Sequence, residues 1–356
     1  MQIRSLIFSA LLLIPELSLP QNIKVLVYEG RATGITGDIS ITQDNTGEFT
    51  LKKNGKIYNS RDGICYHTAE FPVKINSGIY TGTLLFSAQA NVFRIINILD
   101  FEDYVSGVTA CEISHTWPEE AIKAQALVAR TYSWLKYQQN LKNQYHIKAD
   151  DTDQVFRGSA NLPGNIINFT RATAGKIICC RGKPVEAFFH SCCGGVTEEP
   201  ENVWGGKKEQ YPYLKKKTCS YCANSPVFAW KTAIALTELN AKFSSLSAEL
   251  GGITGIRPLE RSSSGRYAKI LVLGKKGSRE MQANFFRMSL GAKNLPSLFF
   301  SASSRGKTIV FSGKGYGHGI GLCQWGAHEL AKRGWNYTGI IRFYFSGITI
   351  ESVPKP

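Results

Sequence analysis

The sequence lacks internal repeats and low-complexity segments, has few acidic residues, and contains no apolar run long enough for a transmembrane helix. The first absence excludes a solenoid or other repeat architecture. The short apolar runs argue against a transmembrane helix, because a helix needs about 20 apolar residues to cross a bilayer. The shortage of acid leaves 42 Lys and Arg against 27 Asp and Glu, a formal net charge of +15. A charge of this size attracts polyanions: nucleic acid, anionic lipid or an acidic cell-wall polymer.

Two further properties narrow the class of protein. No Lys- or Arg-rich run carries interleaved aromatic residues, so the charge does not favour nucleic acid. The 356 residues are 43% hydrophobic and 19% charged. That composition is typical of a globular chain, and the length suffices for one large domain or two modest ones.

The N-terminus has the pattern of a secretory signal peptide. Arg4 precedes an apolar stretch from Leu6 to Ile14, which has the length of a signal h-region. The cleavage site is poor, because residues 18–20 (Ser-Leu-Pro) are not a clean small-x-small pattern. We expect residues 1–20 to be a signal peptide and the protein to be exported to the periplasm or cell envelope. Export argues against nucleic acid as a partner, favours an envelope polymer, and permits peripheral contact with a membrane.

Secondary structure is marked most clearly in the first half of the chain. Residues 23–100 read as β-strands, because short apolar alternations are broken by Asn-Thr-Gly and Asn-Gly turns. Thr116 and Glu119 have the spacing of a capping box, with Pro118 allowed in the first turn, and predict a helix that runs to about Gln139. Further along, the pattern predicts a helix over 236–250, strands over 266–274 and 307–313, a glycine-rich turn, and helices over 322–332 and 337–345.

The predicted helix after Thr116 has an apolar face and a second face with two cations. Lys123 and Arg130 lie seven residues apart on that second face. Solvated charge is the ordinary interpretation, and the alternative is that both line a groove for an anionic chain. Gln125 lies on the apolar face. We take these three residues as candidate substrate contacts.

Three segments far apart in the sequence carry most of the information. They contain EDYVSGVTACEISHTWPEEAIKAQALVARTY from residue 102, AFFHSCCGGVTEEPENVWGG from residue 187, and GKGYGHGIGLCQWGAHELAKRGW from residue 313. Together with DTDQVFRG at 151–158 they resemble the stage II sporulation protein D (SpoIID) family, also called the amidase-enhancer or LytB-type family. The resemblance covers roughly residues 80–355, and four separated matches in order are far more specific than one.

The resemblance implies a lytic transglycosylase that acts on peptidoglycan. Such an enzyme cuts the MurNAc–GlcNAc β-1,4 bond, leaves a 1,6-anhydro-MurNAc end, and prefers glycan strands from which an amidase has removed the stem peptides. We expect an α+β fold, with mixed β-sheet elements around a central catalytic helix and a cysteine-rich loop region. The expected division is a signal peptide over 1–20, a β-rich segment over 21–75 and a SpoIID-like catalytic region over 76–356.

The resemblance carries the family's catalytic glutamate onto Glu112, and the chemistry supports that role. When the nucleophile is the sugar's own 6-hydroxyl, intramolecular attack has a large effective molarity and one carboxyl group suffices. This carboxyl must be neutral at working pH, so its pKa must be raised by a partly apolar setting. Cys111, Ile113 and Trp117 supply such surroundings. The alternative is that Glu112 is a solvated loop residue.

The second candidate site draws on the cysteines, of which the chain has nine. They are Cys65, Cys111, Cys179, Cys180, Cys192, Cys193, Cys219, Cys222 and Cys323. The C-x-x-C of Cys219 and Cys222, with a distant His-x-Cys-Cys at His190, is a zinc signature. From the alignment of the HS-x-C-GG motif we expect His190, Cys193, Cys219 and Cys222 to hold one structural zinc, with Cys192 as an alternate ligand. Disulfides, favoured by export, are the rival interpretation.

The third motif adds two candidate sugar contacts, His318 and Gln324, which project from its glycine-rich turn. Their alternative roles are to fill the turn and to cap the following helix. Two other functions remain open from the sequence. The protein could be a non-catalytic module that binds glycan and stimulates a cell-wall amidase, or, with less support, a zinc amidase. The reaction expected from the resemblance needs no cofactor.

Overall fold

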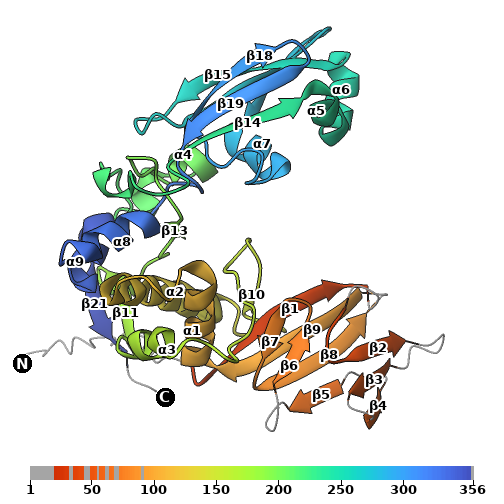
Figure 1. Cartoon of the computed structure of the whole chain (residues 1–356), viewed down its shortest axis with the longest axis vertical. Helices are drawn as coiled ribbons and strands as arrows, with labels where there is room; N and C mark the ends of the chain where they lie inside the picture. Colours follow the sequence, from red (N-terminus) through yellow and green to blue (C-terminus); the bar gives the residue numbers. More distant parts are fainter. Residues whose placement is uncertain are drawn as a thin grey trace, which may run out of the picture.

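The computed structural model describes residues 20–31, 35–43, 49–53, 56–60, 64–67, 72–89 and 92–353. Within these ranges the chain mixes helices with several small sheets, which confirms the expected α+β class (Figure 1). The expected signal peptide lies outside the described residues, apart from Pro20. Among the described helices, none is both long and apolar enough to cross a membrane.

The first part of the chain is β-rich, as residues 23–100 predicted. Its largest sheet has the strand order β10-β1-β9-β8-β5. The strands are β1 (Asn22–Gly30), β5 (Ile64–His67), β8 (Thr83–Gln89), β9 (Val92–Asp100) and β10 (Ile147–Lys148). A second sheet pairs β2 (Ser40–Gln43), β3 (Phe49–Lys53) and β4 (Lys56–Ser60), and β6 (Val73–Ile75) pairs with β7 (Gly78–Tyr80). The largest sheet joins strands from both sides of the boundary predicted at residue 75, so the domain division remains a proposal.

Helices α1 (Phe101–Glu112) and α2 (Glu119–Gln139) form the centre of the molecule. The Asp100 side chain caps α1 by accepting hydrogen bonds from the backbone N–H groups of Glu102 and Asp103. Every residue of α2 from 124 to 134 is buried, because the helix packs against α1, α3, α8, α9 and β11. A helix that is covered on all sides is a core helix.

The α1–α2 connection differs from two of the sequence predictions. No capping box forms at α2, because its N-cap is Pro118 and Thr116 lies two residues too early to reach the helix. The Thr116 hydroxyl lies instead 2.9 Å from the Ser114 hydroxyl. Glu112 is the last residue of α1 and not a loop residue ahead of a helix. The predicted end of α2 at Gln139 is confirmed.

Short elements from distant parts of the sequence surround α2. The small sheet β12-β11-β21 combines β11 (Lys176–Cys180), β12 (Lys183–Pro184) and β21 (Thr349–Ser352). A parallel pair joins β13 (Phe189–His190) to β20 (Leu322–Cys323). The helical elements are α3 (Gly164–Arg171), α4 (Glu201–Trp204), η2 (Lys208–Gln210), η3 (Ser220–Cys222), α8 (Gln324–Lys332) and α9 (Tyr337–Tyr344). The last two agree with the predicted helices to within two residues.

The third part of the chain, residues 229–314, has its own hydrophobic core. Its sheets are β14-β19-β18 and β15-β16-β17. The strands are β14 (Ala229–Ala235), β15 (Ile253–Arg261), β16 (Tyr267–Gly274), β17 (Gly277–Gln282), β18 (Phe300–Arg305) and β19 (Thr308–Lys314), and the helices are α5 (Leu236–Lys242), α6 (Ser244–Leu250) and α7 (Ala283–Leu290).

One prediction for this part needs correction. The single helix expected over 236–250 is two helices, because Phe243 leaves the helical conformation at φ −112° and ψ 50°. Its ring stacks on Phe286 with centroids 5.2 Å apart, so burial of the aromatic side chain breaks the helix. Strands β16 and β19 lie where the sequence predicted them.

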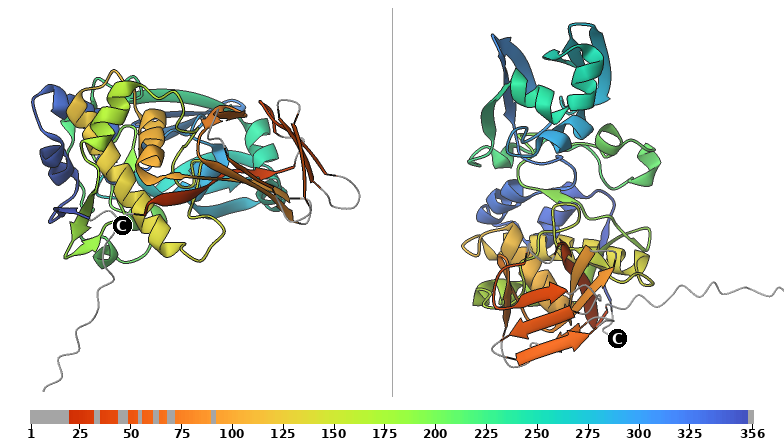
Figure 2. Two further views of the ribbon diagram at one scale, coloured as in Figure 1. Left: turned by 90° about the horizontal axis from the view of Figure 1, so that it is seen from below. Right: turned by 90° about the vertical axis from the view of Figure 1, so that its right-hand side faces the viewer.

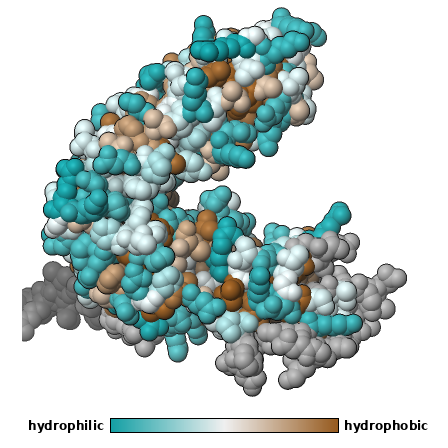
Figure 3. All heavy atoms as spheres, in the orientation of Figure 1, coloured by the Kyte–Doolittle hydropathy of each residue, from teal (hydrophilic) through white to brown (hydrophobic). Residues whose placement is uncertain are grey.

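The three parts follow one another along a curved molecule. The strands of the first part lie at one end, the α1–α2 region in the middle and residues 229–314 at the other end (Figures 1 and 2). The molecule is deeply hollowed on one side between its two ends (Figure 3). Many residues around this hollow are hydrophilic, which suits a polar ligand.

Candidate active site

Glu112 lies where α1 ends and is joined to the third motif by hydrogen bonds. Gln324, the first residue of α8, places its Nε2 at 3.4 Å from Glu112 Oε2 and at 3.3 Å from Gln125 Oε1. Gln125 and Gln324 are buried, whereas Glu112 keeps partial exposure. The structure therefore brings together three of the residues that the sequence singled out, although Gln324 lies 212 positions after Glu112.

The surroundings of Glu112 change its acidity. Burial raises the pKa of its carboxyl group from 4.5 to about 6. Hydrogen bonds from Gln324 and from the Val155 backbone oppose this rise, and the nearby charge of Asp151 adds to it. The carboxyl can therefore be neutral near pH 6 and yet accept hydrogen bonds when it ionises, which is what a proton-transfer group requires.

The two cations predicted to line a groove have other roles. Arg130 is fully buried and forms a bidentate ion pair with Glu102, with Nε–Oε1 at 2.8 Å and Nη2–Oε2 at 2.7 Å. It also donates to Thr170 O and Thr173 Oγ1. Since the guanidinium faces protein on every side, the predicted substrate contact of Arg130 is wrong. The Arg130 side chain is neither a solvated charge nor part of the lining of a groove.

Lys123 is also committed to protein partners. Its ammonium group pairs with Glu119 and Glu120 in the first turn of α2, at 2.9 Å from Glu120 Oε1. The second oxygen of Glu120 accepts a hydrogen bond from the Tyr337 backbone, so this network fixes the start of α9 against α2. These contacts are structural and do not support the predicted sugar contact of Lys123.

His318 belongs to a cluster of aromatic rings. Its Nδ1 accepts a hydrogen bond from the Ile320 backbone at 3.0 Å, and its ring lies 5.6 Å from that of His190 and 5.3 Å from that of Trp204. Burial and the charges of His190 and Arg287 lower the pKa of His318 well below its ordinary value. No hydrogen bond is recorded between His318 and Glu112, so its role as a sugar contact remains a prediction.

The structure brings together four cysteines, and this cluster differs from the predicted ligand set by one residue. The Sγ atoms of Cys193, Cys219, Cys222 and Cys323 all lie within 4.8 Å of one another, and all four residues are buried. His190 is not part of this group: its Nδ1 lies 3.0 Å from the Ile320 carbonyl oxygen. Its Nε2 is buried without a hydrogen-bond partner among the described residues. The fourth thiol of Cys323 therefore takes the place expected for His190.

Neighbouring groups fit closely around the four thiols. The Cys193 N–H lies 3.3 Å from Cys323 Sγ and donates to it, and the Tyr344 hydroxyl lies 3.2 Å from Cys219 Sγ. A Cβ at Gly326 would stand only 2.9 Å from Cys219 Sγ, so α8 can approach only because this position is glycine. Cys192 lies beside the group, with Sγ 3.9 Å from the Cys222 carbonyl oxygen. The cysteines with described side chains are all free thiols.

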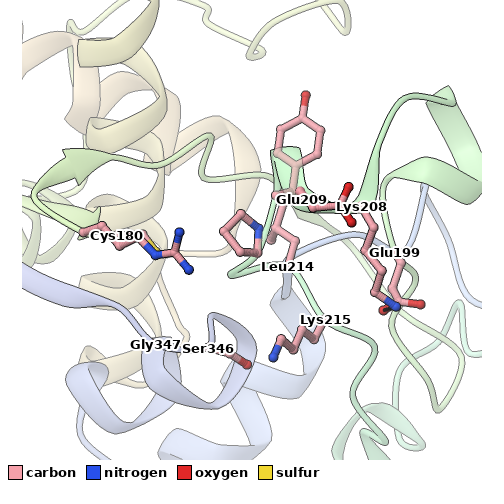
Figure 4. A pocket seen from close by; sticks show the side chains of 11 residues that line it. Cys180, Glu199, Lys208, Glu209, Leu214, Lys215, Ser346 and Gly347 are labelled. Carbon is pink, nitrogen blue, oxygen red and sulfur yellow. Dashed lines mark ion pairs between the residues drawn. The ribbon is translucent and has the colours of Figure 1, made fainter.

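A separate pocket of about 420 Å³ contains none of the predicted site residues (Figure 4). It lies between the segment of residues 199–215 and Ser346–Gly347, and it carries charges of both signs. Lys208 and Glu199 neutralise each other there at 3.1 Å. The internal pairing leaves little net charge to attract an anionic chain, so we keep Glu112 as the candidate active site.

Known proteins resemble this chain over most of its length. A family model described as stage II sporulation protein matches residues 89–179, and a domain of unknown function matches residues 208–321. The stage II sporulation protein D of Bacillus amyloliquefaciens is 31% identical over 269 residues, which are 71% of this chain and 74% of that protein. This chain belongs to the SpoIID family. The resemblance found in the sequence motifs is thereby confirmed.

Two further relatives match this chain over most of its length. A Bacillus subtilis (strain 168) protein named amidase enhancer is 27% identical over 298 residues, which are 70% of this chain and 40% of that protein. An uncharacterised protein of Brachyspira hyodysenteriae is 32% identical over 305 residues, 85% of this chain and 78% of that one. The matched SpoIID region contains both Glu112 and Gln125.

Sequence reasoning missed the positions of two residues: Cys323 in the thiol cluster and Glu102 as the partner of Arg130. Cys323 directly precedes Gln324 in the sequence, but the predicted ligand set contained the histidine of the HS-x-C-GG motif in its place. Glu102 opens the first motif, yet nothing in its local sequence indicates that it pairs with Arg130. In the folded chain His190 and Cys323 are partners in the β13–β20 pair, so Cys323 lies beside the residue that the sequence favoured.

Proposed function

We propose that this SpoIID-family protein is a peptidoglycan lytic transglycosylase with Glu112 as its acid and base. The observation that carries the proposal is the raised pKa of Glu112, about 6, at a position where Gln324 and the Val155 backbone can also hold its anion. The names of the relatives, stage II sporulation protein D and amidase enhancer, support a role at the cell wall. On this proposal the protein works outside the membrane, in the periplasm or cell envelope.

The proposed reaction uses one carboxyl group twice. Neutral Glu112 gives its proton to the bridging oxygen of the MurNAc–GlcNAc bond as the bond to the anomeric carbon breaks. The 6-hydroxyl of the same MurNAc then attacks that carbon, and the Glu112 carboxylate takes the hydroxyl proton. The ring closes to a 1,6-anhydro sugar, Glu112 is again neutral, and no water is consumed.

Gln324 and Gln125 hold Glu112 in place for this reaction. The Gln324 amide reaches both the Glu112 carboxyl and the Gln125 amide oxygen, so the three side chains form one chain of contacts. A donor fixed by burial stabilises the carboxylate that exists between the two proton transfers. We propose Gln324 as the positioning group and the stripped glycan strand as the substrate.

We also propose that Cys193, Cys219, Cys222 and Cys323 bind one structural zinc ion. Tetrahedral coordination with Zn–S distances of about 2.3 Å puts neighbouring sulfur atoms about 3.8 Å apart. The thiols in this structure, mutually within 4.8 Å, fit that geometry. Four protein ligands leave no open position, so the ion would stabilise the loops that carry Cys193 and Cys219 and would take no part in glycan cleavage.

A non-catalytic role is the second candidate, because one relative is named amidase enhancer. Under that function the protein would bind glycan and stimulate a partner amidase, and Glu112 would be dispensable. The two functions are separated by incubating purified protein with amidase-treated peptidoglycan. Our proposal predicts soluble products from the wild type and a loss of about 10²- to 10⁴-fold in Glu112→Gln. Equal activity of a folded Glu112→Gln protein would exclude the proposed role of Glu112.

A further inference from the structure

An exposed tryptophan belongs to the cluster of aromatic rings that contains His318. Trp204 is the last residue of α4, and 44% of its surface is exposed. The ring of Phe188 lies 4.7 Å from the indole between centroids, and the ring of His318 lies 5.3 Å from it. A single exposed apolar residue is common on protein surfaces and needs no explanation by itself. Here two neighbouring rings fix the indole, so it presents a rigid apolar surface to solvent.

The chain that follows Trp204 leaves the indole uncovered. Gly205 and Gly206 have φ values of 76° and 93°, in the left-handed region that favours glycine. A Cβ built on Gly205 would meet no atom within 4 Å apart from its neighbours in the chain, so the space next to this position is open. Helix α4 also lies beside α7, where the middle of the molecule meets its third part (Figure 1). The backbone therefore holds the indole in place without covering it.

Ring contacts connect Trp204 to the helix that carries Gln125. The Phe188 ring, which packs on the indole, also lies 6.2 Å from the ring of Tyr132 in α2. Tyr132 follows Gln125 by seven residues, so both project from the same face of α2, about 10 Å apart along its axis. Gln125 in turn shares the Gln324 amide with Glu112. One face of α2 therefore leads from the candidate active site toward the exposed indole.

The segment of residues 151–155 provides a second, independent connection. Asp153 Oδ1 accepts a hydrogen bond from the Tyr132 hydroxyl at 2.9 Å, and the Val155 backbone donates to Glu112. The Cα atoms of residues two positions apart are separated by at most about 7 Å. Tyr132 and Glu112 thus contact the same short stretch of chain. Trp204, which is joined to Tyr132 through one ring, lies within a few sugar units of the Glu112 carboxyl group.

We propose that Trp204 is a sugar-stacking subsite next to the candidate active site and binds a pyranose ring of the glycan strand. The flat indole suits the apolar face of a pyranose ring. Within the described chain, the two rings recorded against Trp204 carry no charge, because burial lowers the pKa of His318 and keeps that imidazole neutral. The ring cluster therefore favours a neutral sugar face over a free anion. The identity of the ligand rests on the proposed function, whereas the fixed and exposed indole does not.

The test measures affinity for two probes, amidase-treated glycan strands and neutral β-1,4-linked GlcNAc oligomers. The full chain carries Glu112→Gln, so that the strands stay intact during the measurement. Adding Trp204→Ala should weaken binding of both probes about 5- to 10-fold, because stacking on an aromatic ring needs no charge. Trp204→Phe keeps a flat ring and should retain most of the affinity. Trp204→Leu keeps apolar bulk without a flat ring and should lose as much as Trp204→Ala, so it decides the question if the alanine variant does not fold.

Trp335 provides the matched control. Its surface is 39% exposed, and its ring packs on that of Phe343 at 6.2 Å between centroids. Trp335→Ala should leave both affinities unchanged. The proposal would be overturned by unchanged affinities in a folded Trp204→Ala or Trp204→Leu protein, by an equal loss in Trp335→Ala, or by a loss confined to the charged strands.

Release of anhydro sugars by the protein with intact Glu112 is measured separately. Weaker glycan binding by Trp204→Ala, in a protein that releases no anhydro sugar, would support the subsite and contradict the reaction. Anhydro-sugar release together with unchanged binding by Trp204→Ala would contradict the subsite alone. If Trp204 instead docks a partner amidase, its loss would reduce stimulation of that amidase and leave glycan binding intact, which would also overturn the proposal.

Discussion

At the residue scale, the proposed reaction depends on the proton of Glu112. Its surroundings have two opposing effects on the pKa. Burial favours the neutral acid, while Gln324 and the Val155 backbone favour the anion. A group that must give a proton and then take one back needs both kinds of contact. The balance places the pKa at about 6, where either form is readily reached.

Removing the amide that faces Glu112 should change the pH dependence. Gln324→Met keeps similar volume but deletes a donor to the carboxylate, so the pKa of Glu112 should rise further. Because the neutral acid starts the proposed reaction, the alkaline limb of the rate profile should move to higher pH. Glycan-release rates measured between pH 4 and 8 check this. Gln282→Met, in the third part of the chain, is the control and should leave the limb in place; a limb unmoved in Gln324→Met would contradict the assignment.

The raised pKa of Glu112 should also affect how the stability of the folded protein depends on pH. The folded state keeps the proton of Glu112 between the ordinary pKa of 4.5 and the folded value of about 6, so the acid costs stability as the pH rises through that window. Glu112→Gln removes this loss. The variant should therefore have a melting temperature near that of the wild type at pH 4 and a higher one at pH 7. A lower melting temperature at pH 7 would show that Glu112 is a stabilising residue.

At the scale of elements, α2 is held by a buried ion pair as well as by its apolar surface. Arg130 joins it to Glu102 of α1 and to the end of α3 at Thr170. Removing one partner leaves the other charged and buried, so Arg130→Met or Glu102→Gln should lower the free energy of unfolding by about 3–5 kcal/mol. Urea titration measures this. The exposed pair of Arg171 and Asp103 is the control and should cost less than about 1 kcal/mol.

The cysteine group should bind metal with a defined stoichiometry. Native protein should contain about one zinc ion per chain, and Cys323→Ser should reduce both the zinc content and the melting temperature. Elemental analysis and thermal denaturation check this. Cys180→Ser removes a thiol outside the group and should change neither. Full zinc content in Cys323→Ser together with loss in His190→Ala would restore the ligand set expected from the sequence.

These elements show where sequence reasoning succeeds. Strong periodicity predicted α2 to its last residue and the strands β16 and β19 closely. The start of α2 and the break at Phe243 were missed, because both are decided by tertiary packing and not by local propensity. Tertiary packing also decides the contacts of the single residues that the motifs singled out. Glu112 and Gln324 come together only in the folded chain. Arg130 was expected on the surface of the helix but is buried in the core.

At the scale of the whole molecule, the three parts of the curved chain are joined by specific contacts (Figure 1). The middle holds Glu112, and the third part is tied to it through Arg266, whose Nη1 donates to Val196 O at 2.8 Å. Arg266 also donates to the carbonyl oxygen of Cys193, one of the four clustered thiols. The third part and the cysteine group are thus linked through one buried arginine. The net charge of +15 suits the anionic glycan that we propose as substrate.

The most direct test of the central claim is the mass of the glycan ends released in water enriched in heavy oxygen. A transglycosylase reaction predicts 1,6-anhydro-MurNAc ends, lighter than hydrolysis products by one water molecule and free of heavy oxygen. These products should come from the wild type and be absent from Glu112→Gln. Reducing ends that carry heavy oxygen, or anhydro ends formed equally by the variant, would contradict the account.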